Sequence, residues 1–231
     1  VLLYFKDPCR SSLKKTGGAR YADLEILGSS GAIAEATLIQ SARAMLAEEG
    51  YTETSVEINS IGDRDSIARF TRELTAYYRK HINDMTPECR QMLKRDPFEL
   101  LSSRSADAQS VNKDAPRSID FLSETSRRHL EEVLEYLEAL EVPYVINNGL
   151  NGNHKYCTET VFTIVNKNPT KKTNQHLLAV GVRYNGLAKR IGMKRDIQGV
   201  GISLLLKSAT ASLRKSVSKA KRPISSFIQL G

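Results

Sequence analysis

The stretch Ser55-Val56-Glu57-Ile58-Asn59-Ser60-Ile61-Gly62 decides the fold, together with Thr158-Glu159-Thr160-Val161-Phe162 much later in the chain. Both stretches mix β-branched and polar residues in the way that sheet strands do. The segment between them carries mostly helix signals. This order predicts a sheet that is interrupted by a helical segment.

Helix signals begin before the first of these strands. Residues 32–49 carry apolar side chains at helical spacing, and Gly50 follows at the position of a C-terminal cap. After the strand, Asp63 or Asp65 is a suitable cap for a second helix that continues through Tyr78.

Two further helices are expected before residue 142. Thr86 is a suitable N-cap with Pro87 at the first helical position, where its missing N–H costs nothing. A long helix starts at Ser123 and ends before Pro143. Residues 102–112 are polar and predict a loop.

The remaining strands predict the fold class. Residues 158–165 and 176–182 read as strands on either side of a turn at 166–169. We therefore expect an α+β fold, an antiparallel sheet flanked by helices with a helical insertion. The expected boundaries are a sheet core at 1–62 and 142–222, an insertion at 63–141, and a following domain or tail beginning at 223–231.

Composition excludes several classes of protein. The chain has 231 residues, of which 40% are hydrophobic, which is enough to bury a core. No apolar run approaches the roughly 20 residues that cross a bilayer, so we expect a soluble protein without a membrane partner, in the cytoplasm by default. Cys9, Cys89 and Cys157 are odd in number and widely spaced, which predicts free thiols and no metal site.

Charge is segregated along the chain. Residues 166–231 hold 14 Lys and Arg and a single acid, Asp196, whereas residues 1–165 hold 20 basic and 25 acidic residues. Such a basic segment attracts phosphate-bearing partners. The alternative interpretation is that these charges form the solvated face of a helix or a tail, above all at 207–222.

The order and spacing of six segments resemble the insertion domain of bacterial histidyl-tRNA synthetases. These segments are Glu-Ile-Asn-Ser-Ile-Gly at 57–62, Thr-Pro-Glu-Cys-Arg at 86–90, Asp-Pro-Phe-Glu-Leu-Leu at 96–101, residues 114–122, residues 126–131, and Val-Pro-Tyr at 142–144.

That resemblance implies the class II synthetase sheet. It also implies activation of histidine with ATP and Mg²⁺, transfer to tRNA, an insertion that clasps the acceptor arm, and a homodimer. The family's motif 1 would lie before Val1, and its anticodon-binding domain would begin near Pro223.

At the expected active site the resemblance is partial. Asp7-Pro8-Cys9-Arg10 resembles the motif 2 strand, which makes Arg10 a candidate phosphate-binding residue, but Ser12 stands where the family has an acid. On the returning strand, our alignment places Ile26 and Ser30 where the family has the Gln and Glu that surround the substrate.

The family's histidine-specific signature matches Gly152-Asn153-His154-Lys155-Tyr156-Cys157-Thr158. The catalytic arginine falls on Gly152, or on Asn151 with a slip of one, and Lys155 replaces an Asp. Tyr156 and Thr158 are retained, as pocket residues or as ordinary strand residues. His154 is expected to be a loop residue, because no histidine or carboxylate is expected near it.

In the last two motifs, this sequence also differs from the family pattern. Residues 181–187 resemble Gly-Gly-Arg-Tyr-Asp-Gly-Leu, and Tyr184 matches a substrate-lining tyrosine. In the motif 3 region, Leu205 replaces a glycine beside the adenine, Ser208 replaces an arginine, and Lys207 replaces an acid. Gly199 and Gly201 are expected to be packing devices.

These losses predict a paralogue with impaired histidine activation that binds tRNA-like RNA or a protein partner. The candidate RNA-binding residues are Lys189, Arg190, Lys194, Arg195, Lys215 and Lys219. One alternative is an active ligase in which Lys155, Lys207 or Arg183 replaces the lost cations. Another is a regulatory subunit like the synthetase-like partner of ATP phosphoribosyltransferase.

Overall fold

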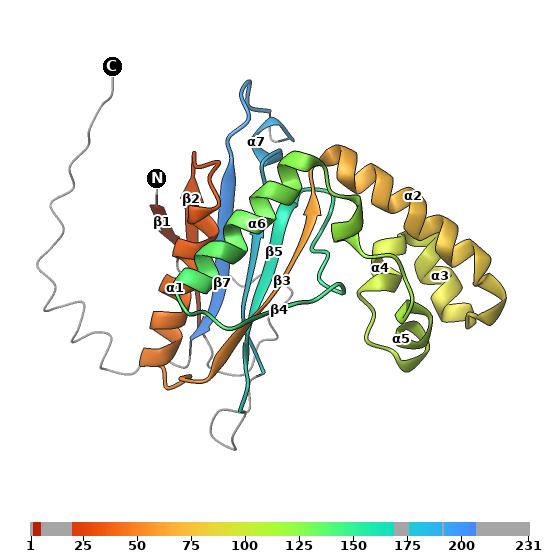
Figure 1. The fold of residues 1–231 in the computed structure, drawn as a ribbon, viewed down its shortest axis with the longest axis horizontal. Helices are drawn as coiled ribbons and strands as arrows, with labels where there is room; N and C mark the ends of the chain where they lie inside the picture. Colours follow the sequence, from red (N-terminus) through yellow and green to blue (C-terminus); the bar gives the residue numbers. More distant parts are fainter. Residues whose placement is uncertain (1, 6–19, 169–175, 191, 207–231) are drawn as a thin grey trace, which may run out of the picture.

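The computed structural model describes residues 2–5, 20–168, 176–190 and 192–206 (Figure 1). Its strands form one seven-stranded sheet in the order β1-β2-β7-β6-β5-β3-β4. Only the β3–β4 pair is parallel, and the other neighbours are antiparallel. The strands are β1 (Leu2–Phe5), β2 (Arg20–Leu27), β3 (Thr54–Gly62), β4 (Tyr144–Ile146), β5 (Thr158–Asn166), β6 (Leu177–Arg183) and β7 (Gly199–Leu206). The expected α+β class with a mostly antiparallel sheet is confirmed.

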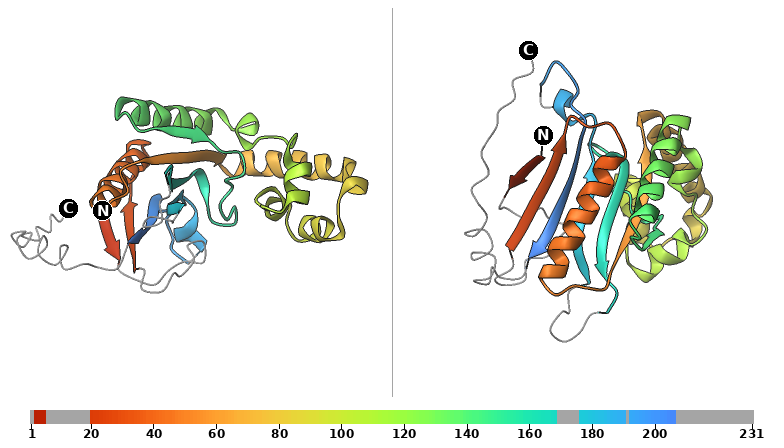
Figure 2. Two further views of the ribbon diagram at one scale, coloured as in Figure 1. Left: turned by 90° about the horizontal axis from the view of Figure 1, so that it is seen from below. Right: turned by 60° about the vertical axis from the view of Figure 1, so that its left-hand side comes forward.

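Helices cover one face of this sheet and also form a lobe beside it (Figure 2). On the sheet lie α1 (Ile33–Glu48) and α6 (Glu124–Ala139), which also contact each other. The helical lobe, residues 64–121, holds α2 (Arg64–Lys80), η1 (Ile82–Asp84), α3 (Pro87–Arg95), α4 (Pro97–Leu101), α5 (Ala106–Asn112) and η2 (Ser118–Phe121). A short α7 (Leu187–Arg190) follows β6.

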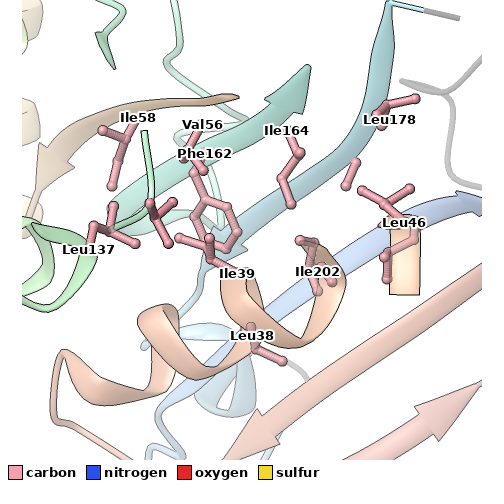
Figure 3. Close-up of a cluster of buried hydrophobic side chains, with 14 of the residues drawn as sticks. Leu38, Ile39, Leu46, Val56, Ile58, Leu137, Phe162, Ile164, Leu178 and Ile202 are labelled. Carbon is pink, nitrogen blue, oxygen red and sulfur yellow. The ribbon is translucent and has the colours of Figure 1, made fainter. Parts of the chain in front are cut away.

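The main hydrophobic core lies between the sheet and helices α1 and α6 (Figure 3). Phe162 on β5 is fully buried there, and Gly181 on β6 leaves the space that its ring fills. Val133 and Leu137 bring α6 into the same core. Helix α6 therefore packs with the sheet, although it follows the lobe in sequence.

The helical lobe has its own core around Phe70, Leu74 and Tyr78 of α2. Phe98 of α4 packs against Phe70 in a T-shaped, edge-to-face arrangement, with ring centroids 5.5 Å apart. A second cluster of buried side chains explains how residues 64–121 pack as a unit beside the sheet.

The expected helix ends are confirmed. Gly50 has a φ of +89° after α1, which glycine adopts without strain. The Asp63 side chain accepts a hydrogen bond from the Ser66 N–H at 2.8 Å, and Thr86 caps α3 with Pro87 in its first turn.

The loop expected at 102–112 is wrong, because α5 occupies Ala106–Asn112. Ser105 caps this helix by accepting from the Ala108 N–H at 3.2 Å. Ala108 is its only buried residue, so the segment shows no apolar periodicity. Its helical character depends on the cap and on packing against the lobe.

Cys89 is a buried free thiol, Cys157 is also buried, and Cys9 lies outside the described residues. None of the described helices combines the length and the apolar character that a membrane crossing requires.

Candidate functional site, a pocket on the open face of the sheet

A pocket of about 850 Å³ lies on the sheet face opposite α1 and α6. Side chains of β2, β3, β5, β6 and β7 line it, and the loop before β5 and the α5 region of the helical lobe complete its wall. The pocket therefore lies between the sheet and the helical lobe, and both contribute lining residues.

Glu25 and Tyr184 meet in this pocket. The Tyr184 hydroxyl donates a hydrogen bond to a carboxylate oxygen of Glu25, although β7 lies between their strands. Two glycines of β7 make this contact possible. A Cβ at Gly199 would lie 2.4 Å from the Tyr184 ring, and one at Gly201 would lie 2.2 Å from the Glu25 carboxylate. The packing role expected for both glycines is confirmed.

Glu25, and not Ser30, is the residue of this region that lines the pocket. The alignment placed the substrate-side acid at Ser30, but Ser30 is exposed in the loop that follows β2. Glu25 lines the pocket instead. The signal that identifies it is its register, since Glu25 pairs with Gly201 on the neighbouring strand.

Gly152 lies in the pocket wall and is itself exposed, with Cys157 and Val161 on one side of it. Its φ is +53°, and a Cβ there would lie 3.2 Å from the Cys157 Sγ and 3.3 Å from a Val161 methyl carbon. Gly152 is one of the two positions, with Asn151, where our alignment places the family's catalytic arginine, and its positive φ favours glycine. Asn151 is buried and donates to the Phe98 carbonyl oxygen at 2.9 Å.

The expected pocket residues divide into two groups. Tyr156 and Tyr184 line the pocket, together with Glu57 and Thr163, which sequence reasoning missed. Thr158 is not among the lining residues, and its hydroxyl accepts the Asn185 N–H at 3.0 Å. Its observed contact is with the backbone after β6.

The His154 ring stacks on Phe98 with centroids 4.3 Å apart, and its Nε2 lies 3.7 Å from a carboxylate oxygen of Asp96. The expectation that no carboxylate lies near His154 is therefore wrong. The partner comes from the helical lobe, which is distant in sequence. Together with Asn151, this stack attaches the loop before β5 to α4.

Arg183 is not available as a substitute cation for phosphate. It is fully buried, and its guanidinium donates to both carboxylate oxygens of Glu35, at 2.6 and 2.5 Å. His129 and Thr160 also contact Glu35, at 2.8 and 3.1 Å. Burial by itself would raise the pKa of Glu35, but the hydrogen bonds from Arg183 and His129 hold that pKa below its ordinary value.

Leu205 lies on the same face of β7 as Gly201 and is only 5% exposed. An apolar, buried side chain therefore stands at the position where the family resemblance places the adenine-side glycine. Lys207 and Ser208, which complete the motif 3 comparison, lie outside the described residues, as do Arg10 and Ser12.

The basic candidates are only partly described. Lys194 and Arg195 are exposed in the segment before β7, and Lys189 of α7 lies 3.1 Å from a carboxylate oxygen of Asp196. Arg190 belongs to α7. Lys215 and Lys219 lie outside the described residues. Within the described ranges no group of three His, Cys, Asp or Glu residues could hold a metal ion.

Histidine–tRNA ligases are similar to this chain. That of Chlorobium phaeobacteroides is 31% identical over 191 residues, which cover 83% of this chain and 43% of the relative. That of Fervidobacterium nodosum is 34% identical over 179 residues, covering 78% and 41%. The chain therefore spans less than half the length of these curated relatives. No protein-family model matches it.

Solved structures agree on the fold. The apo histidyl-tRNA synthetase of S. aureus has a TM-score of 0.65 and 23% identity, covering 94% of this chain and 51% of its own. An ATP phosphoribosyltransferase regulatory subunit/histidyl-tRNA synthetase from Bacillus halodurans has a TM-score of 0.53 and 20% identity, covering 89% and 56%. By sequence and by fold, this chain is homologous to the catalytic region of histidyl-tRNA synthetases.

Proposed function

We propose that this chain is a histidyl-tRNA synthetase-like protein with impaired histidine activation, which binds tRNA-like RNA. The observation that carries the first half is Gly152. Activation needs cations where charge develops on the reacting carboxylate and phosphate, and Gly152, whose φ is +53°, occupies the expected arginine position and carries no charge.

Two further observations support impaired activation. Leu205 is packed into the open face of the sheet, where the adenine-side glycine is expected. Arg183, one of the candidate replacements for the lost cations, is held by Glu35 on the opposite face. A missing charge-assisted contact of this kind typically costs about 2.7–4 kcal/mol in the transition state.

The RNA half of the proposal is supported by charge. Lys194 and Arg195 are exposed, and in this part of the chain Asp196 is the single acid. Asp196 is already paired with Lys189, so the charges of Lys194 and Arg195 are left to attract phosphates. The expected division into a sheet core, an insertion at 63–141 and a following segment belongs to this proposal, as does a homodimer.

Histidine-dependent exchange between ATP and pyrophosphate tests the first half, with an authentic synthetase in parallel. Absence of exchange from protein shown to be folded by circular dichroism is expected. Exchange above background would overturn impaired activation and favour the second candidate, an active ligase that uses ATP and Mg²⁺. Glu25 and Tyr184 in the pocket are the observation that favours that candidate.

RNA binding is tested separately with an unmodified tRNA transcript over a series of salt concentrations. Lys194→Gln with Arg195→Gln should weaken binding and make the salt slope shallower by about 1 to 2. Lys80→Gln with Lys94→Gln, two exposed changes on the helical lobe, separately tests the share of binding that comes from the insertion, which the family resemblance assigns to the acceptor arm. An unchanged affinity and slope in the 194/195 variant would overturn the proposed RNA surface.

A further inference from the structure

The pocket contains a buried hydroxyl that has no hydrogen-bond partner in the described part of the chain. Thr163 of β5 is 6% exposed and lines the pocket, and its Oγ1 makes no hydrogen bond among the described residues. A buried hydroxyl left unpaired costs free energy. Such a group on a pocket wall is satisfied when a bound molecule supplies the missing partner.

A carboxyl group lies beside this hydroxyl. Glu57 of β3 is the cross-strand partner of Thr163, so both side chains stand on the same face of the sheet. Both line the pocket. Asn147 donates its Nδ2 to one Glu57 oxygen at 2.8 Å, which holds the carboxylate in place. The pair offers hydrogen-bond acceptors and a negative charge at one place.

The charge of the pocket is uneven. Its floor carries Glu25 and Glu57, whereas Arg104 and Lys113 are exposed side chains contributed by the helical lobe. Negative charge on the floor favours a cation there and disfavours an anion. Gly152, in the wall, has no charge to offset a carboxylate.

We propose that Glu57 and Thr163 form a subsite for the protonated amine of a small organic molecule that has no carboxylate next to that amine. The ammonium group would donate to the Glu57 carboxylate and to the Thr163 Oγ1. This inference deepens the proposed function and rests on it, because the same loss of an arginine at Gly152 removes the partner of an amino acid's carboxylate.

The test compares histamine with histidine by isothermal titration calorimetry. The two molecules share an imidazole and an amine and differ in the carboxylate. Histamine is expected to bind at least tenfold more tightly. Equal binding, tighter binding of histidine, or no binding of either at millimolar concentrations would overturn the proposal.

Two variants test whether Thr163 and Glu57 hold the amine. Thr163→Val keeps the shape of the side chain and removes the hydroxyl, and Glu57→Gln removes the charge. Each should weaken histamine binding at least tenfold, while Glu131→Gln, an exposed change on α6, should leave it unchanged. Unchanged binding by folded Thr163→Val and Glu57→Gln proteins would overturn the assignment.

The two proposals fail separately. Loss of amine selectivity in a protein that shows no pyrophosphate exchange and still binds the transcript contradicts only the subsite. Histidine-dependent exchange contradicts impaired activation, and the subsite inference then fails with it.

Discussion

Arg183 and Glu35, 148 residues apart, form a two-point ion pair in which both side chains are fully buried. The guanidinium also donates to the carbonyl oxygens of Ser29 and Gly31, at 2.9 and 3.2 Å. These bonds tie β6 to the segment before α1 and to α1 itself. A charge pair with so many hydrogen bonds organises the helix-covered face of the sheet.

Arg183→Met should lower the free energy of unfolding by about 3–5 kcal/mol, because it leaves the buried Glu35 carboxylate without its main partner. Urea denaturation measures this. Arg128→Ala, which removes an exposed partner of Glu124, should cost less than about 1 kcal/mol. The double variant Glu35→Met with Arg183→Met should recover part of the loss. Equal costs for Arg183→Met and Arg128→Ala would contradict a structural ion pair.

Glu159→Gln should stabilise the protein at pH 7. Burial raises the pKa of Glu159, and its Oε2 has no hydrogen-bond partner among the described residues. Ionisation therefore costs stability in the folded state, at about 1.4 kcal/mol for each unit by which the pKa is raised.

The sign of this effect sets its pH dependence. A raised pKa in the folded state gives full stability below the unfolded pKa of about 4.3, and that stability is lost as the pH rises through the folded pKa. The advantage of the Gln variant should therefore shrink as the pH falls. Melting temperatures of the parent protein and of Glu159→Gln, measured from pH 4 to 8, test this. A stability difference that does not change with pH would contradict the raised pKa of Glu159.

Asp63→Ala should show the opposite pH dependence. Burial acts to raise the pKa of Asp63, but hydrogen bonds from Ser123 and Ser66 outweigh it and lower the pKa. The stability that this carboxylate contributes is present above the unfolded pKa of about 3.9 and lost as the pH falls through the folded pKa. The variant should cost about 1 kcal/mol at pH 7 through the lost N-cap, and less in acid. A cost that grows in acid would refute this assignment.

The elements that could be predicted from sequence are those with a strong local signal. Residues 32–49 and the caps at Asp63 and Thr86 depend on spacing within a few residues, and each was confirmed. Helix α5 lacked such a signal, because it buries only Ala108. Helix α5 therefore forms because it packs against the other helices of the lobe, which the local sequence does not reveal.

The candidate site was harder to predict because it is assembled across strands. Glu25 was missed because its place in the pocket follows from pairing with Gly201, which no local pattern in β2 reveals. Arg183 was misjudged because strand residues alternate between faces. Tyr184 and Val182 line the pocket, whereas Arg183 points to the other face and meets Glu35 on α1.

Gly152 gives the last prediction. Gly152→Ala should destabilise the protein more than Gly192→Ala, although both positions have positive φ. A non-glycine residue in the left-handed region costs about 1–2 kcal/mol, and the φ of +92° at Gly192 lies further from that region than the +53° at Gly152, so the backbone cost is no smaller at Gly192. Only at Gly152 would the added Cβ also crowd Cys157 and Val161, whereas at Gly192 it would meet nothing within 4 Å. A larger loss of unfolding free energy for Gly152→Ala than for Gly192→Ala would therefore show that contact with Cys157 and Val161 is costly, and an equal or smaller loss would contradict this prediction. Gly152→Arg by itself should not produce histidine-dependent pyrophosphate exchange, because Leu205 still stands where the adenine-side glycine is expected.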